Sequence, residues 1–320
     1  MKQAKELNLK SFTTIDAYKT FFNFYVVYLI FSLLLFVISI IVSEGTGVAF
    51  ENLQDIKAFE IFTILLSPLM FFTLFIWQSK RHRGSICANI GINKRINYKH
   101  IILAVASAVF CIVFFAPITT LFDNILSIIG FNPSDEIVMN GVGDLLLNIL
   151  LLAILPAVLE ELIFRGIIFS GLKDKHSAFN TILVSSTFFM LMHGTLQQTV
   201  FQFIIGIVLG LIMYYTDNVL YPIIMHFVSN LIILLAAFFS TSSAPIDVSF
   251  NFLNVFLPIV LALIGVAIIF FVCKFLNKKK QPWTNNLTFK NYTFSEKKYA
   301  ICSVLISIIL WLVRTAEVFV

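Results

Sequence analysis

Nine apolar runs follow one another along this chain, and they constrain its fold more than any other feature of the sequence. They cover residues 24–42, 61–77, 101–121, 145–172, 181–193, 201–215, 219–239, 252–275 and 299–313. Lipid offers no hydrogen-bond partner to a bare peptide group, so a membrane-spanning segment is a helix or a strand of a closed barrel. The runs are continuous and lack the alternation of barrel strands. We therefore predict an all-α, polytopic transmembrane helical bundle of about nine helices, or eight if one run is re-entrant.

The composition excludes the common soluble classes of protein. Hydrophobic residues make up 59% of the chain and charged residues 12%, and the 36 phenylalanines are too many for a water-exposed surface. Soluble enzymes and DNA-binding proteins are thereby excluded. The four cysteines show no Cys-x-x-Cys spacing, so neither a thiolate zinc site nor a disulfide framework is indicated. The first run is longer than a signal-peptide core and lacks a small-residue cleavage site, which predicts a retained helix.

The charges of the loops predict the orientation in the membrane. The segment 80–99 carries six Lys and Arg, whereas residues 122–144 carry none. Lysines also precede the first run and open the loop that begins at residue 274. Because cytoplasmic loops are enriched in Lys and Arg, we predict a cytoplasmic N-terminus and, with nine spans, a C-terminus on the outside. The membrane would be the plasma membrane if the chain is bacterial.

The run 145–172 contains three ionisable residues, Glu160, Glu161 and Arg165. Each such residue in a membrane span costs about 2.5 to 3.5 kcal/mol, which indicates function. On a helix Glu161 and Arg165 are i and i+4, the spacing at which a carboxylate meets a guanidinium. Glu160 has only apolar neighbours on its own helix, so it must take up a proton or find a partner elsewhere, as catalytic carboxylates do. The alternative is an ion network that only packs helices.

Two histidines and an amide lie in later apolar runs. His193 ends one run, and His226 and Asn230 share a helical face at i and i+4. Taken separately, His193 is typical of an interfacial residue, and the other two are typical of a polar seam between helices. Together with Glu160 they could form a two-histidine, one-carboxylate metal site, or a base-activated water with an amide oxyanion donor. Straight, perpendicular helices would leave the two histidines more than about 10 Å apart in depth unless tilt narrows the gap.

The run 201–215 carries small residues at Gly206 and Gly210. A small-xxx-small spacing lets a membrane helix approach its neighbour closely. We interpret this pair as a packing motif.

The order and spacing of the polar residues resemble a known family. Three motifs lie on successive predicted helices: Glu160-Glu161-x-x-x-Arg165, Phe189-x-x-x-His193 and His226-x-x-x-Asn230. In this order they resemble the motifs of the CPBP or Abi family of CAAX-processing and bacteriocin-processing intramembrane endopeptidases. The resemblance covers about residues 144–236, and the other helices are interpreted from composition alone.

The resemblance implies a polar catalytic cavity within the membrane, where a peptide bond of a hydrophobic or lipidated membrane peptide or protein is hydrolysed. Glu160 would activate water with His193 beside it. His226 and Asn230 would complete a metal site or stabilise the oxyanion. If zinc is used, Glu160, His193 and His226 would bind it, and a metal-free glutamate mechanism is the other option.

The resemblance also assigns supporting residues and divides the chain. Glu161 and Arg165 would hold the first motif in place. Residues 1–143 would form N-terminal transmembrane helices and loops, 144–236 the protease-like core, and 237–320 the C-terminal transmembrane helices with a basic cytoplasmic loop. The expected partners are the membrane substrate and the lipid bilayer, with no nucleic acid. Bacterial members of the family are associated with bacteriocin immunity and peptide processing, and no feature of this sequence selects among such substrates.

Two functions of other classes stay open at this point. One is a non-proteolytic membrane scaffold that regulates a partner membrane protein through its transmembrane helices. The other is a proton-coupled transporter, for which two similar halves are expected. The sequence contains no such internal repeat.

Overall fold

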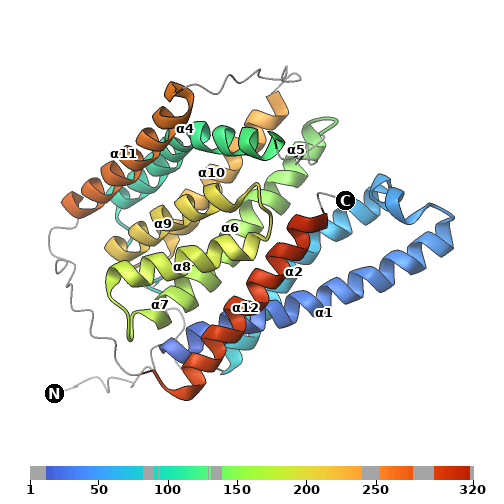
Figure 1. The fold of residues 1–320 in the computed structure, drawn as a ribbon, viewed down its shortest axis with the longest axis horizontal. Coiled ribbons are helices and arrows are strands. Elements are labelled where there is room, and N and C mark those ends of the chain that lie inside the picture. The colour runs from blue at the N-terminus through green and yellow to red at the C-terminus, as the bar shows by residue number, and fades with distance from the viewer. Residues whose placement is uncertain are drawn as a thin grey trace.

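The computed structural model describes residues 12–81, 90–92, 94–128, 130, 139–239, 252–276 and 292–317. Regular structure in these residues is entirely helical, and eight helices are long and apolar enough to cross a membrane (Figure 1). They are α1 (Thr14–Thr46), α2 (Lys57–Arg81), α4 (Tyr98–Ile128), a composite helix (Val142–Leu172), α9 (Thr199–Thr216), α10 (Leu220–Phe239), α11 (Phe252–Leu276) and α12 (Phe294–Glu317). A further apolar helix, α8 (Ala178–His193), has only 16 residues. The predicted all-α polytopic bundle is therefore confirmed, and each apolar run lies in one of these helices, except that the run 219–239 begins one residue before α10.

The composite helix contains two π-helical segments. Its consecutive segments are α5 (Val142–Asn148), η2 (Ile149–Ile154), α6 (Leu155–Glu161), η3 (Leu162–Ile168) and α7 (Phe169–Leu172), of which η2 and η3 are π-helical. Pro156 lies in the first turn of α6 and lacks a backbone N–H, so one hydrogen bond of the helix is missing next to η2. Segment η3 starts directly after Glu161 and contains Arg165. The first sequence motif therefore spans a transition between α-helical and π-helical backbone.

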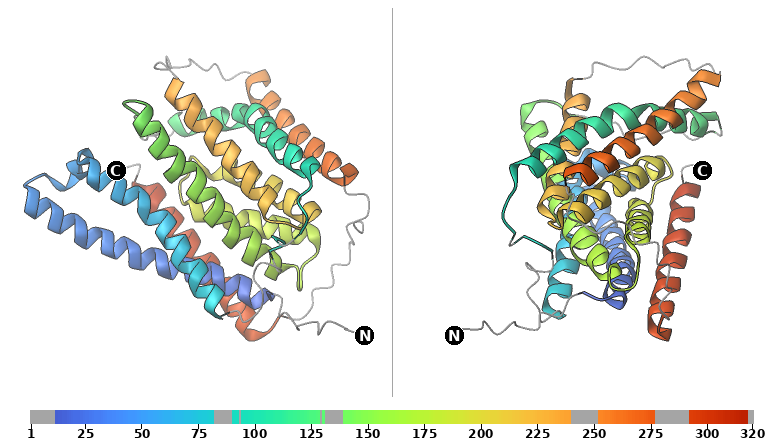
Figure 2. Two further views of the ribbon diagram at one scale, coloured as in Figure 1. Left: turned by 180° about the vertical axis from the view of Figure 1, so that it is seen from behind. Right: turned by 90° about the vertical axis from the view of Figure 1, so that its left-hand side faces the viewer.

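The central helices are enclosed by helices from both ends of the chain. Helices α8 and α9 pack against each other, and α10 packs against α6 and α9. Helix α1 packs against α2 and α12 on one side of this centre, and α4 packs against α10 and α11 on the other (Figures 1 and 2). Helix α1 also contacts η3, and α2 contacts α6. The segment that carries Glu160, Glu161 and Arg165 is thus covered by the two N-terminal helices.

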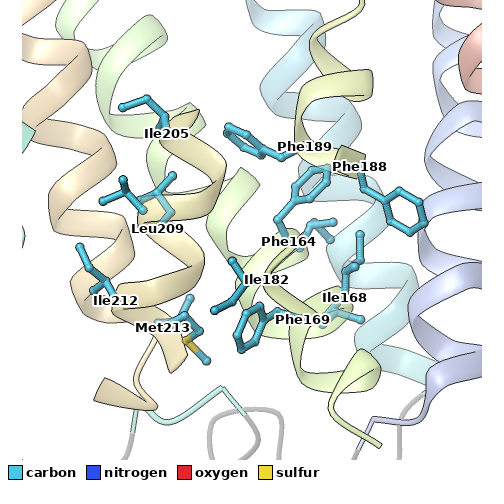
Figure 3. Packing of buried hydrophobic residues seen from close by; sticks show 14 of the residues in the cluster. Phe164, Ile168, Phe169, Ile182, Phe188, Phe189, Ile205, Leu209, Ile212 and Met213 are labelled. Carbon is cyan, nitrogen blue, oxygen red and sulfur yellow. The ribbon is translucent and has the colours of Figure 1, made fainter. Parts of the chain in front are cut away.

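Buried apolar side chains join the composite helix to α8 and α9 (Figure 3). The residues labelled there are Phe164, Ile168, Phe169, Ile182, Phe188, Phe189, Ile205, Leu209, Ile212 and Met213. A Cβ atom added at Gly206 would lie 3.1 Å from the Cα of Ser186, and one at Gly210 would lie 3.1 Å from a methyl carbon of Ile182. The two glycines therefore allow α9 to pack closely on α8, which confirms the packing motif.

Basic residues of two predicted cytoplasmic segments meet at one end of the bundle. Lys94 and Lys173 both form ion pairs with Asp217, and Lys173 lies 2.9 Å from it. This places the described part of segment 80–99 on the same side as the loop after the composite helix. Residues 82–89, 93, 131–138 and 277–291, which carry part of the charge pattern, lie outside the described residues. The orientation of this end toward the cytoplasm stays a prediction.

Candidate active site

Glu161 and Arg165 form a fully buried ion pair. The Arg165 Nη1 donates to Glu161 Oε1 at 2.8 Å, and both side chains have 0% exposure. The Nη2 of Arg165 donates to the carbonyl oxygen of Gly206 at 3.2 Å, and the guanidinium carbon lies 4.4 Å from the centre of the Phe189 ring. The predicted pairing at i and i+4 is confirmed. The pair also fastens the composite helix to α9 and to α8.

His226 is directed to Glu161 by its hydrogen bond. Its Nδ1 lies 3.0 Å from Glu161 Oε1, the same oxygen that binds Arg165. A carboxylate only accepts, so Nδ1 carries the proton in this bond. Asn230, one turn later on α10, donates through Nδ2 to the carbonyl oxygen of Leu152 at 3.1 Å. These two bonds attach α10 to the composite helix beside the glutamates.

Glu160 and His193 form a separate pair. The Glu160 side chain is buried, with 7% exposure, and its Oε2 has no hydrogen-bond partner among the described residues. The Nε2 of His193 lies 3.9 Å from that oxygen. The Nδ1 of His193 donates to the carbonyl oxygen of Phe189 at 2.8 Å, which leaves Nε2 of the neutral ring as an acceptor that faces Glu160. Glu160, which has no partner on its own helix, thus has its neighbour on α8.

Phe189 brings the two histidines into one site. Its ring centre lies 4.7 Å from that of His193 and 5.9 Å from that of His226. The large difference in depth that straight helices would impose is therefore absent. The reason is the length of α8, because 16 residues span only about 24 Å, less than the roughly 30 Å of a bilayer core. The helix ends at His193, where Gly194 adopts the left-handed conformation with φ of 68°.

A cavity of about 330 Å³ opens beside Glu160 and His193. Helix α1 supplies Tyr28 to its wall and α12 supplies Arg314. Further lining residues are Phe24, Phe31, Ser32, Leu35, Thr63, Leu66, Ser67, Met70, Phe71 and Met192. Arg314 directly follows the last apolar run, and it is not among the residues that the sequence predicted for the site. Its intramembrane contacts depend on the packing of α12 and are not visible in the sequence.

The predicted zinc ligands are Glu160, His193 and His226. Among the described residues, no three His, Cys, Asp or Glu side chains are gathered in a way that could hold a metal ion. Glu160 and His193 face each other, whereas the Nδ1 of His226 is bonded to Glu161. The three residues do not form a preformed metal site in this arrangement, and zinc binding stays a prediction.

Comparisons with known proteins identify the central part of the chain. Residues 142–232 match the family model of the type II CAAX prenyl endopeptidase Rce1-like proteins. No match was found among curated proteins or among solved structures. The match includes the composite helix, α8, α9 and the first part of α10, and with them every residue of the three motifs. Residues 142–232 are thus similar to the Rce1-like type II CAAX prenyl endopeptidases, in agreement with the resemblance to the CPBP family of intramembrane proteases.

Proposed function

We propose that this protein is an intramembrane endopeptidase that cleaves a hydrophobic or lipidated membrane peptide or protein with water activated by Glu160. The family match supports an intramembrane protease in general. The observation that carries the proposal is the Glu160–His193 pair at the cavity wall. A buried carboxylate oxygen without a hydrogen-bond partner is costly in a membrane protein, and such residues are retained for function.

The distance between the two side chains suits a bound water molecule. A separation of 3.9 Å is too long for a direct hydrogen bond, but one water can bond to both atoms. Because Nε2 and the ionised carboxylate are both acceptors, the water would donate one hydrogen to each. Its lone pairs would then point away from both groups and toward a substrate in the cavity.

The reaction balances with Glu160 as the only group that exchanges protons. The water oxygen bonds to the scissile carbonyl carbon while one of its protons moves to Glu160. The carbonyl electron pair becomes the oxyanion of a tetrahedral intermediate. Glu160 then returns the proton to the leaving amide nitrogen, the carbon–nitrogen bond breaks, and an acid and an amine are released. His193 orients the water through Nε2.

The remaining motif residues would position the site and stabilise the intermediate. The amide of Asn230 has a second N–H beyond the one bonded to Leu152, and we assign that group to the oxyanion. Glu161 accepts hydrogen bonds from His226 and Arg165 through the same oxygen, Oε1. Together these three side chains fix α10, α9 and the composite helix around Glu160.

The proposal is tested by comparing membrane fractions from cells that carry wild-type protein, Glu160→Gln or the control Glu51→Gln. Glu51 is an exposed carboxylate in η1 (Phe50–Asp55), far from the motif residues in sequence. Mass spectrometry of new peptide termini should find products with wild type and the control and none with Glu160→Gln, at equal amounts of protein. Identical termini from all three proteins would contradict the proposal and favour the membrane scaffold.

A further inference from the structure

Arg314 of α12 is held against the cavity by two residues. Its Nε donates to the hydroxyl of Tyr28 at 3.2 Å, its Nη2 donates to the same hydroxyl, and its Nη1 donates to the carbonyl oxygen of His193 at 3.4 Å. The guanidinium carbon also lies 4.7 Å from the centre of the Tyr28 ring. The guanidinium is therefore fixed next to a residue of the proposed catalytic pair, although α12 lies outside the matched domain.

The positive charge of Arg314 has only neutral partners. The ion pairs among the described residues include none to Arg314, whereas Arg165, deeper in the bundle, is paired with Glu161. An arginine near the end of a membrane helix commonly extends to the membrane surface. The half-buried Arg314 instead lines the cavity that contains Glu160. An intramembrane charge turned inward without a counter-charge indicates a binding function.

The remaining donors of Arg314 match a carboxylate. A guanidinium has five N–H groups, and the hydrogen bonds to Tyr28 and His193 use three of them. One N–H is left on Nη1 and one on Nη2. Two such parallel donors bind the two oxygens of a carboxylate.

The backbone of Gly194 lets Arg314 approach the end of α8. A Cβ atom at this position would collide with Nη1 of Arg314. The φ of Gly194 is 68°, a value that residues with a side chain rarely adopt. The same glycine that ends α8 after His193 thus leaves the room that the guanidinium occupies. The end of α8 therefore fixes the position of the Arg314 guanidinium.

We propose that Arg314, oriented by Tyr28, binds the C-terminal carboxylate of the peptide substrate. This inference rests on the proposed function and adds a specificity-determining residue to it. Arg314 contacts His193 itself, and an extended chain advances about 3.3 to 3.6 Å per residue, so the carboxylate would lie within a few residues of the cleaved bond. A cavity of about 330 Å³ is at the small end for drug-sized ligands and accommodates a short chain end.

The test uses purified full-length protein in liposomes and a mixed-sequence library of hydrophobic decapeptides with blocked N-termini. One form of the library ends in a free carboxylate and one in a carboxamide, and a third is the carboxamide with one Asp at varied positions. Initial rates and cleavage positions are measured by mass spectrometry for wild type, Arg314→Met and the matched control Arg81→Met. Arg81 is an exposed arginine at the end of α2, with its guanidinium carbon 5.4 Å from the centre of the Trp77 ring.

Wild type and Arg81→Met should cleave the free-acid library about ten- to a hundredfold faster than the carboxamide, at a fixed distance from the C-terminus, as expected for a charge-assisted hydrogen bond. Arg314→Met should reduce that ratio to about one. Equal cleavage of both forms by wild type would overturn the inference while leaving the proposed function intact, and this comparison needs no variant. A preference that instead follows the Asp side chain would overturn the assignment to the chain end. Cleavage of no library by wild type would reject both the proposed function and the inference.

Discussion

Replacing Glu161 by Gln should destabilise the protein, whereas the same change at Glu160 should not. Glu161 and Arg165 are fully buried at 2.8 Å. Removing one partner of a buried ion pair costs roughly 3 to 5 kcal/mol, because the other charge is left without compensation. Arg165 keeps its contacts with Gly206 and Phe189, so we expect about 3 kcal/mol, the lower end of that range. Glu160→Gln removes an unpartnered carboxylate oxygen and should leave the stability unchanged or raise it.

The free energy of unfolding by denaturant in mixed micelles measures these differences. A matched control is Glu60→Gln, which removes one partner of the largely exposed pair with Lys57, 3.0 Å apart. Exposed pairs contribute about 0 to 1 kcal/mol, so this change should be small. Combining Glu161→Gln with Arg165→Met should recover part of the loss, because no unpaired charge then remains.

Two outcomes would refute this reasoning. In the first, Glu161→Gln unfolds at the same free energy as the exposed control, which would mean that Arg165 is hydrated or otherwise compensated. In the second, the effects of Glu161→Gln and Arg165→Met simply add, which would mean that the two side chains do not act as a pair.

Four further outcomes are expected. Single cysteines introduced in segment 80–99 should resist a membrane-impermeant maleimide in intact cells, and those in 122–144 should react. The reason is that segment 80–99 carries six Lys and Arg and segment 122–144 carries none, and basic loops stay in the cytoplasm. The reverse labelling pattern would invert the topology. His193→Ala and His226→Ala should each abolish cleavage, and the double variant should be hardly worse, because groups of one catalytic unit are strongly non-additive. If zinc is used, purified protein should carry about one ion and lose activity to a chelator, whereas the glutamate mechanism should survive exhaustive chelation. His176 lies between α7 and α8, and burial lowers its pKa, so its contribution to stability should be present above about pH 6.5 and lost as the pH falls below it; equal pH dependence in His176→Asn would disprove this.

Local spacing predicted the parts of the site that lie on one helix. The pairing of Glu161 with Arg165 follows from positions i and i+4, and the close packing at Gly206 follows from its spacing to Gly210. The apolar runs predicted where the helices lie, because a continuous apolar run in lipid must form a helix. These inferences need no knowledge of how the helices are arranged.

Contacts between helices could not be predicted in the same way. His226 was expected to act together with Glu160, and the bond of its Nδ1 to Glu161 was not foreseen. The π-helical segment η2 packs against α10 just before α6, and an apolar run has no signal for such a segment. Arg314 stands directly after its apolar run, where an arginine is typical of the membrane surface. Only the packing of α12 on α1 and its contact with α8 turn it toward the cavity.

The π-helical backbone of the composite helix also makes its function sensitive to chain length. A π-turn holds one residue more than an α-turn, so deleting a residue from η3 would let this segment close into an ordinary α-helix. If the lost residue lies between Glu161 and Arg165, the two are only three residues apart, and Arg165 turns by about 100° relative to Glu161, because each α-helical residue turns the chain by that angle. Arg165 could then no longer meet both Glu161 and Gly206. Losing a single apolar residue between 162 and 164 should therefore be more harmful than replacing it, although the hydropathy of the span would hardly change.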